Sequence, residues 1–192
     1  MILGAKSNSF VFRFPHRFIP EELETKYNTY LKRLPTPFES ISDYINHTIQ
    51  SVTIPSVSAD EVEQINGRKT TVDGKNISKH PQYWRQSLDL QRVIPKEFTV
   101  NFKSSDGYLN YWALFETFMW YLTVTNKEDY FPDMSLTYLD RDGYEMLVIF
   151  MRQPLMKSIS EVEMNYSSTS MEFKSFSVTF KYNWFDIDVK QS

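Results

Sequence analysis

Hydrophobic and polar positions alternate with a period of two in several short segments of the chain. Residues 10–14 place three phenylalanines on one side, and residues 98–102 and 134–138 repeat the pattern with other apolar side chains. The longest alternation, 176–184, has aromatic residues and valine in one phase and Ser, Thr, Lys and Asn in the other. Because successive side chains of a strand point to opposite faces of a sheet, each segment predicts a strand with one apolar face.

Two further segments predict strands of a different kind. Residues 48–54 end at Pro55, which lacks the N–H that a central strand needs. Residues 144–151 are almost continuously apolar, which is typical of a strand covered on both faces. Asp142-Gly143 directly precedes this segment and is a common hairpin turn. The chain therefore predicts roughly six or seven strands in all.

Helical periodicity appears in three places. Residues 20–34 begin with a proline and two glutamates, which favour the first turn of a helix, and 38–46 adds a shorter piece. The broadest apolar stripe follows Ser105-Asp106, either of which can cap a helix, and comprises Tyr108, Tyr111, Trp112, Phe115, Phe118, Met119 and Leu122. We expect this helix to pack against a sheet and to reach a neighbouring subunit.

These elements predict a mainly β fold with some α (α+β), with one main helix. The helices at about 16–46 are an insertion between two strands. Residues 56–80 are polar and lack a core pattern, so we expect an extended loop or arm there. A length of 192 residues fits a single domain over 1–192.

Composition narrows the classes of function. The hydrophobic fraction of 41% is sufficient for a core, and the absence of cysteine excludes disulfides, thiolate nucleophiles and cysteine-bound metals. A net charge of -3 with scattered Lys and Arg argues against an electrostatic nucleic-acid binder. Neither a signal-peptide pattern nor a run of 18 apolar residues occurs, so we expect no membrane contact and synthesis in the cytoplasm.

Motifs for enzyme chemistry are missing from the sequence. His16, His47 and His80 lie too far apart for a paired metal spacing, and no nucleophile elbow or phosphate-binding glycine loop occurs. We therefore expect no catalytic, metal or cofactor-binding residues, and a protein that is not an enzyme. Paired carboxylates at 140–142 and 186–188 leave a hydrolase open as an alternative, although turns and strand ends usually carry such residues simply because they are solvated.

The aromatic helix leaves a second alternative from another class. Trp112 and Trp120 could form a stacking platform of a carbohydrate-binding β-sandwich module if both were exposed. Their helical spacing favours core packing instead.

Five segments follow one another in a characteristic order. They are Ser51-Val52-Thr53-Ile54-Pro55, a polar excursion with Gly67-Arg68, the strand at Phe98 to Phe102, a helix after Asp106-Gly107-Tyr108, and a closing strand at Phe176 to Tyr182. This order and spacing, over about residues 8–186, resembles the tail tube proteins of contractile-tailed bacteriophages, whose superfamily includes the type VI secretion tube.

The resemblance implies an antiparallel β-sandwich or a barrel-like tail-tube fold. It also implies a structural virion protein of the phage tail, without catalytic residues. Its copies would assemble as hexameric rings that stack into a tube, the channel for DNA ejection. Implied partners are further copies, the tail sheath protein, the baseplate and tail-terminator proteins, and the tape measure protein and passing DNA in the lumen, without sequence-specific binding. Because 16–46 departs from the minimal pattern, a baseplate tube-initiator or tail-completion protein that forms a single ring stays open.

Two sets of residues follow as candidates for this assembly. The polar phase of the closing strand suits a wet lumen, and its members are Ser175, Ser177, Thr179, Lys181 and Asn183. The polar face of 98–102 is the equivalent choice. The loop used between neighbouring subunits corresponds to the polar excursion, with Gly67, Arg68, Lys69 and Gly74 as its candidate residues.

Overall fold

The computed structural model describes residues 9–15, 17–35, 38–53, 61–65, 70–72, 75–77, 82–86, 97–124, 130–162 and 174–190. The chain divides into two compact units, Met1–Ile54 with Lys96–Ser192 and, separately, Pro55–Pro95. The smaller unit contains two antiparallel ladders, in which β3 (Glu61–Ile65) pairs with β6 (Gln82–Gln86) and β4 (Thr70–Val72) pairs with β5 (Lys75–Ile77). The hydropathy pattern did not predict these strands, because they are short and largely polar.

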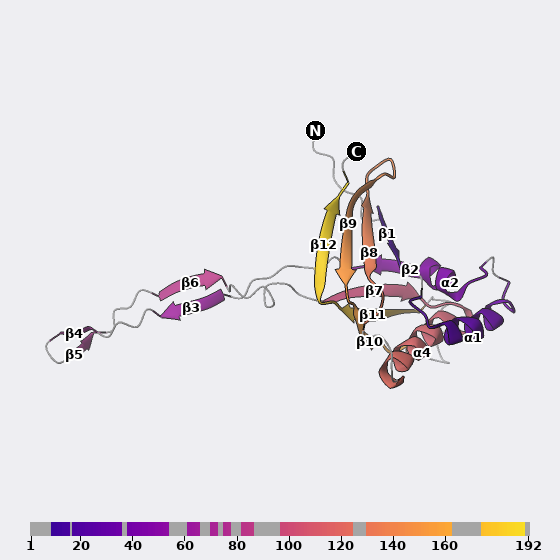
Figure 1. Ribbon diagram of the computed structural model, residues 1–192, viewed down its shortest axis with the longest axis horizontal. Coiled ribbons are helices and arrows are strands. Elements are labelled where there is room, and N and C mark those ends of the chain that lie inside the picture. Colours follow the sequence, from indigo (N-terminus) through magenta and orange to yellow (C-terminus); the bar gives the residue numbers. More distant parts are fainter. Residues whose placement is uncertain are drawn as a thin grey trace. The chain divides into compact units, whose positions relative to one another are not determined.

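The larger unit contains two four-stranded antiparallel sheets (Figure 1). Sheet A has the order β1 (Phe10–Arg13), β8 (Met134–Leu139), β9 (Glu145–Arg152) and β12 (Trp184–Val189). Sheet B has the order β10 (Leu155–Ile159), β11 (Ser175–Lys181), β7 (Glu97–Lys103) and β2 (Ile49–Val52). The predicted α+β fold with antiparallel sheets is confirmed, and in the described residues it is an open sandwich, since neither sheet closes on itself.

Phenylalanine rings from both sheets make the core between them. Phe98 and Phe180 of sheet B stack with centroids 5.1 Å apart, and Phe12 of sheet A meets Phe98 at 6.0 Å. Phe102 stacks on Phe176 at 5.0 Å. All five rings are buried, and burying each contributes about 1.5–3 kcal/mol. The strands of the two sheets cross one another in Figure 1, an arrangement known from orthogonal sandwiches.

The closing strand predicted at 176–184 is divided between the two sheets. β11 ends at Lys181, Tyr182 is buried, and β12 starts at Trp184 in sheet A. The backbone N–H of Asn183 donates to the Arg152 carbonyl at 3.1 Å. The chain therefore turns between β11 and β12. The alternation of polar and apolar residues continues through this turn, so hydropathy alone does not reveal it.

Among the described residues of the larger unit, three α-helices are present, and they lie beside sheet B (Figure 1). They are α1 (Glu21–Leu31), α2 (Ile41–His47) and α4 (Leu109–Thr123), and the short 3-10 turn η1 (Asp106–Tyr108) precedes α4. Ser40 caps α2 by accepting the Ser42 N–H at 3.2 Å. Lys26 of α1 and Glu116 of α4 form an ion pair at 2.6 Å.

Buried Asn110 fixes the start of α4 to its neighbours. Its Oδ1 accepts hydrogen bonds from the Ser105 N–H at 3.2 Å, the Ser105 hydroxyl at 2.9 Å and the Tyr111 N–H at 2.9 Å. Its Nδ2 donates to the Thr48 hydroxyl at 3.0 Å and to the Lys103 carbonyl at 2.8 Å. One amide thus joins α4 to the end of α2 and the end of β7.

Candidate functional site on the polar face of sheet B

Sheet B has one face in the core and one polar face to which all four strands contribute. On β11, Phe176, Val178 and Phe180 are buried, whereas Ser177 and Thr179 lie on the opposite side and are half-buried. The register continues this division across the sheet, pairing Ser177 with Asn101 and Thr179 with Thr99. The polar residues of this face are Ser51, Thr53, Glu97, Thr99, Asn101, Lys103, Lys157, Ser158, Ser175, Ser177, Thr179 and Lys181. The apolar Leu155 of β10 pairs with Lys181 and lies at its edge.

Short polar side chains hydrogen-bond across the strands of this face. The Thr99 and Thr179 hydroxyls lie 3.2 Å apart, and Asn101 Nδ2 donates to the Ser51 hydroxyl at 2.8 Å. The Thr53 hydroxyl donates to the Thr99 carbonyl at 2.8 Å and prolongs the pairing of β2 with β7. Cross-strand pairs of this kind stabilise a sheet by about 0.2–1 kcal/mol each. The result is a smooth, wettable surface without large side chains at its centre.

Charged residues stand at the margins of the polar face. Glu97 and Lys157 form an ion pair, with the lysine nitrogen 2.8 and 2.9 Å from the two carboxylate oxygens. Lys103 and Lys181 complete the charged set, so one glutamate and three lysines give a formal charge of +2. A surface of this modest charge attracts polyanions weakly compared with a clustered basic patch.

The structure brings four of the five predicted lumen residues together. Ser175, Ser177, Thr179 and Lys181 line one side of β11. Asn183 lies in the turn toward β12, where its Nδ2 donates to Gln153 Oε1 at 3.2 Å.

The contributions of β2 and β10 to this face were not predicted from the sequence. The alternation of Ser51 and Thr53 around Val52 was available as a signal for β2. On β10 the register shifts between Met156 and Ser158, and this bulge brings Ser158 to the polar face, where simple alternation from buried Met156 does not place it. The predicted inter-subunit residues Gly67, Arg68, Lys69 and Gly74 lie outside the described residues.

The carboxylates considered for hydrolysis have structural partners. Asp140 accepts the N–H groups of Asp142 and Tyr144, both at 2.8 Å, and so closes the β8–β9 turn. Arg152 bridges Asp133 and Asp186, at 2.7 Å from each. Although partial burial opposes it, hydrogen bonding from the Arg152 guanidinium and the Gln153 N–H lowers the pKa of Asp133. Among the described residues, no cluster of three or more His, Asp or Glu side chains is arranged to hold a metal ion.

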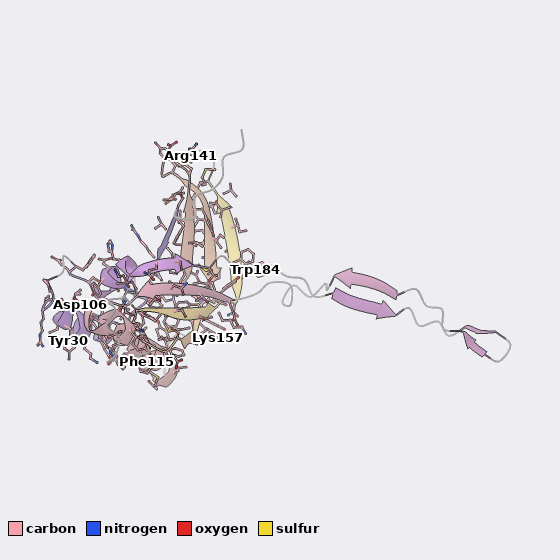
Figure 2. All side chains as sticks on the ribbon, turned by 180° about the vertical axis from the view of Figure 1, so that it is seen from behind. Tyr30, Asp106, Phe115, Arg141, Lys157 and Trp184 are labelled. Carbon is pink, nitrogen blue, oxygen red and sulfur yellow. The ribbon has the colours of Figure 1, made fainter. Side chains whose placement is uncertain are left out.

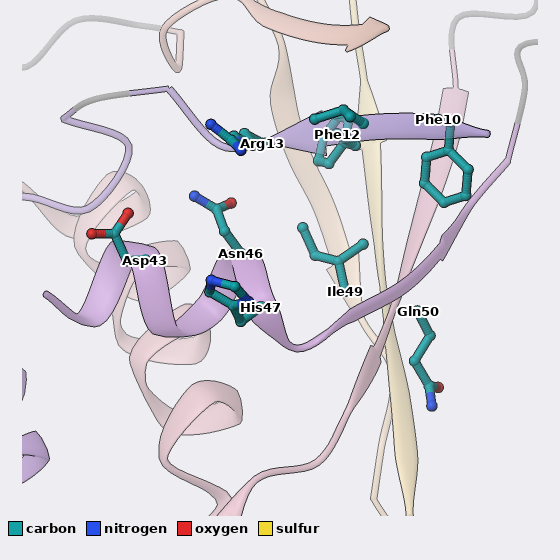
Figure 3. A pocket seen from close by; sticks show the side chains of 9 residues that line it. Phe10, Phe12, Arg13, Asp43, Asn46, His47, Ile49 and Gln50 are labelled. Carbon is teal, nitrogen blue, oxygen red and sulfur yellow. The ribbon is translucent and has the colours of Figure 1, made fainter. Parts of the chain in front are cut away.

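A hollow of about 520 Å³ lies where β1, α2 and β2 meet (Figure 3). Its lining residues are Phe10, Val11, Phe12, Arg13, Asp43, Asn46, His47, Ile49 and Gln50. Asn46 serves the fold there, because its Oδ1 accepts the Phe14 N–H at 2.8 Å. β1 and β2 are edge strands of the two sheets, so the hollow lies between two sheet edges.

The two tryptophans considered for a carbohydrate platform differ in exposure. Trp112 is exposed, whereas Trp120 is half-buried and packs edge-on against Tyr121 with centroids 5.1 Å apart. The expected core packing of the aromatic helix therefore holds for one side of α4 only. In the described part of the chain, no helix has the length and apolar character needed to cross a bilayer.

An open α+β sandwich with one continuous polar sheet face defines the structural class of this chain, and chains in solved structures of contractile injection systems have a similar fold. One such chain comes from the anti-feeding prophage cap, which is the tube terminating cap of that particle. The alignment covers 99% of this chain and 94% of the cap chain, with 11% identity and a TM-score of 0.57. A chain of the sheath–tube complex of an extracellular contractile injection system aligns with 97% of this chain and 93% of its own, at 11% identity and 0.55. A third similar chain comes from the anti-feeding prophage baseplate. It is 12% identical, and the alignment covers 98% of both chains with a TM-score of 0.56. No protein-family model and no curated protein matches the sequence.

These likenesses confirm the predicted resemblance to tail tube proteins at the level of fold. Cap, tube and baseplate proteins score almost alike.

Proposed function

We propose that this chain is a structural, non-catalytic subunit of the tube in a contractile phage tail or a related injection particle. Copies assemble into rings, hexameric in the tail-tube pattern, and the rings stack so that the polar face of sheet B lines the channel. The observation that carries the proposal is this face, in which all four strands present short polar side chains opposite a phenylalanine core. The shared fold of tube and cap proteins supports it.

The chemistry of the face suits a passage. A channel for DNA ejection must wet readily without holding phosphates, and a formal charge of +2 spread over the margins of the face meets both needs. The Thr99 hydroxyl pairs with the Thr179 hydroxyl, and the Asn101 amide donates to Ser51, so the hydrogen-bonding groups at the centre of the face are engaged within the sheet.

Partners and location follow from this role. The proposed subunit contacts other copies, the sheath on the outside of the tube, and the baseplate and tail-terminator proteins at its ends. A tape measure protein and then DNA occupy the lumen. The chain is made in the host cytoplasm and ends in the virion or particle tail. The separate Pro55–Pro95 unit, which includes the expected arm at 56–80, contacts neighbouring copies.

Electron microscopy of the purified full chain tests the proposal. Long hollow tubes are the expected result. Rings that do not stack would instead favour a tube-initiator or terminating-cap role, which the equal likeness to the cap and baseplate proteins keeps in view. A monomer at all concentrations would overturn both.

A labelling experiment tests which face lines the channel. The chain contains no cysteine, so Ser175→Cys places a single thiol on the polar face and Thr25→Cys places one on exposed α1 as a control. In assembled tubes we expect a small maleimide to label both variants and a bulky polyethylene-glycol maleimide to label only Thr25→Cys. Equal labelling of Ser175→Cys by both reagents in intact tubes would show that sheet B does not face the lumen.

A further inference from the structure

Helix α4 is apolar on two opposite sides. Ala113, Leu114 and Thr117 face the core and are fully buried. On the other side Trp112 is 47% exposed, Met119 42% and Leu122 63%, and Phe115 lies between them half-buried. At 100° per residue, Trp112, Phe115, Met119 and Leu122 fall within an arc of about 80°, directly opposite the core. We name these four residues the α4 stripe.

The α4 stripe has the properties of a packing surface. Its sequence spacing of three, four and three residues is that of the contact positions of paired helices. It offers on the order of 300 Å² of apolar surface, as much as the largest patch of a typical monomer. The stripe itself has no charge, and the carboxylate of neighbouring Glu116 is held by Lys26 of α1. The surface that it fits is therefore apolar.

A second apolar surface lies at the edge of sheet A. Phe185, Ile187 and Val189 of β12 are on the face of sheet A that forms the core, since Ile187 pairs with Ile149 and Val189 with Leu147. Yet Ile187 is 55% and Val189 62% exposed, which shows that sheet B does not cover this corner. We name Phe185, Ile187 and Val189 the β12 row.

The two surfaces match in length and character. Positions 185–189 span about 13 Å along a strand, and positions 112–122 span about 15 Å along a helix. An open sheet face is ordinarily covered by a helix lying across it. Within one copy the two surfaces cannot meet, because α4 and β12 lie apart in the larger unit; Figure 2 shows Phe115 of α4 and Trp184 of β12 at separate places.

We propose that the α4 stripe of one copy packs on the β12 row of a second copy. The contact is head-to-tail: each pairing leaves the β12 row of the first copy and the α4 stripe of the second copy free, so assembly continues until a ring closes or rings stack. This inference rests on the proposed self-assembly and adds the surfaces that join the copies.

Cross-linking in this cysteine-free chain tests the contact directly. Copies with Met119→Cys are mixed with copies with Ile187→Cys and treated with a short bismaleimide. Covalent dimers are expected in the mixture and not with either variant alone. Dimers of Met119→Cys alone would show α4 pairing with itself, and a lack of dimers in wild-type-like assemblies would show another partner; either result overturns the proposal. Thr25→Cys with Ile187→Cys is the matched control and should stay monomeric on a denaturing gel.

Charge substitutions give a second measurement. Met119→Glu and Ile187→Glu each place a carboxylate in the contact and should raise the protein concentration at which assemblies appear by about tenfold or more, since each 1.4 kcal/mol lost is a factor of ten. Mixed in equal amounts, they should form dimers but no larger assemblies, because the intact row of Met119→Glu meets the intact stripe of Ile187→Glu and the two altered surfaces stay unpaired. Tyr144→Glu, exposed and outside both surfaces, is the control.

The outcomes separate the two proposals. A wild-type chain that never assembles refutes the proposed function. Assembly of both glutamate variants at the wild-type concentration refutes only the α4–β12 contact.

Discussion

Removal of the Asn110 side chain should disconnect α4 from sheet B at its first turn. The amide is fully buried and makes five hydrogen bonds, to Ser105, Tyr111, Thr48 and Lys103. In Asn110→Ala the Lys103 carbonyl loses the Nδ2 donor, and the Ser105 and Tyr111 N–H groups lose their acceptor. The substitution therefore leaves several half-buried backbone groups unsatisfied.

The magnitude follows from this count. A typical hydrogen bond contributes about 1 kcal/mol net, and a buried group left without a partner costs about 1–3 kcal/mol. Since water can reach the half-buried Ser105 and Tyr111 sites, we expect a total loss of about 3–4 kcal/mol in the free energy of unfolding. For a chain of this size each kcal/mol lowers Tm by about 2–4 °C, so Tm should fall by about 10 °C.

Thermal and urea unfolding, followed by circular dichroism at concentrations below assembly, measure this effect. Asn101→Ala is the matched control, because that amide donates one bond, to Ser51, at the sheet surface. We expect the control to lose less than about 1 kcal/mol. If Asn110→Ala were as stable as Asn101→Ala, the amide would not be the joint between α4 and the sheet.

Three further outcomes are expected. Phe180→Ala removes a fully buried ring at the centre of the sandwich and should cost about 3–5 kcal/mol in urea unfolding; a loss below 1 kcal/mol would contradict the core assignment. Gly143→Ala places a side chain at φ +90 and should cost about 1–2 kcal/mol, with calorimetry as the check; an unchanged Tm would mean that the turn adapts. Because the pKa of Asp133 is lowered in the folded state, its contribution is present above the unfolded pKa and lost as pH falls through the folded value. Asp133→Asn should therefore slightly reduce the fall in the free energy of unfolding between about pH 5 and pH 2. The effect is small because the ion pair with Arg152 is exposed. An unchanged dependence of this free energy on pH in the acid range would count against the prediction.

The sequence predicted the strands of the core well, because alternation reports directly on a sheet with one buried side. Phe98, Val100 and Phe102, like Phe176, Val178 and Phe180, are buried as their spacing indicates. The helix at Leu109–Thr123 and the turn at Gly143 also follow from local signals. The polar face of β11 was predicted for the same reason, since it is the complement of the buried phase.

Features that depend on distant pairing were beyond the sequence. Nothing local shows that β2 and β10 flank β7 and β11, and the bulge near Lys157 alters the phase of β10. The break at Asn183 divides one uninterrupted alternation between two sheets. The exposure of Trp112 was not predicted. The sequence pattern of an apolar helix stripe is the same whether the stripe packs against its own chain or against another chain.

The number of strands in sheet B has a consequence for how copies can join. With four strands, each antiparallel to the next, the outer strands β10 and β2 run in opposite directions. Rotation about a common axis would set β2 of one copy beside β10 of the next as an antiparallel neighbour. Every seam of such a ring could then repeat the pairing found inside the subunit, whereas an odd strand count would force a parallel seam. The even number of strands in sheet B therefore allows antiparallel pairing to continue without interruption around a closed ring of identical chains.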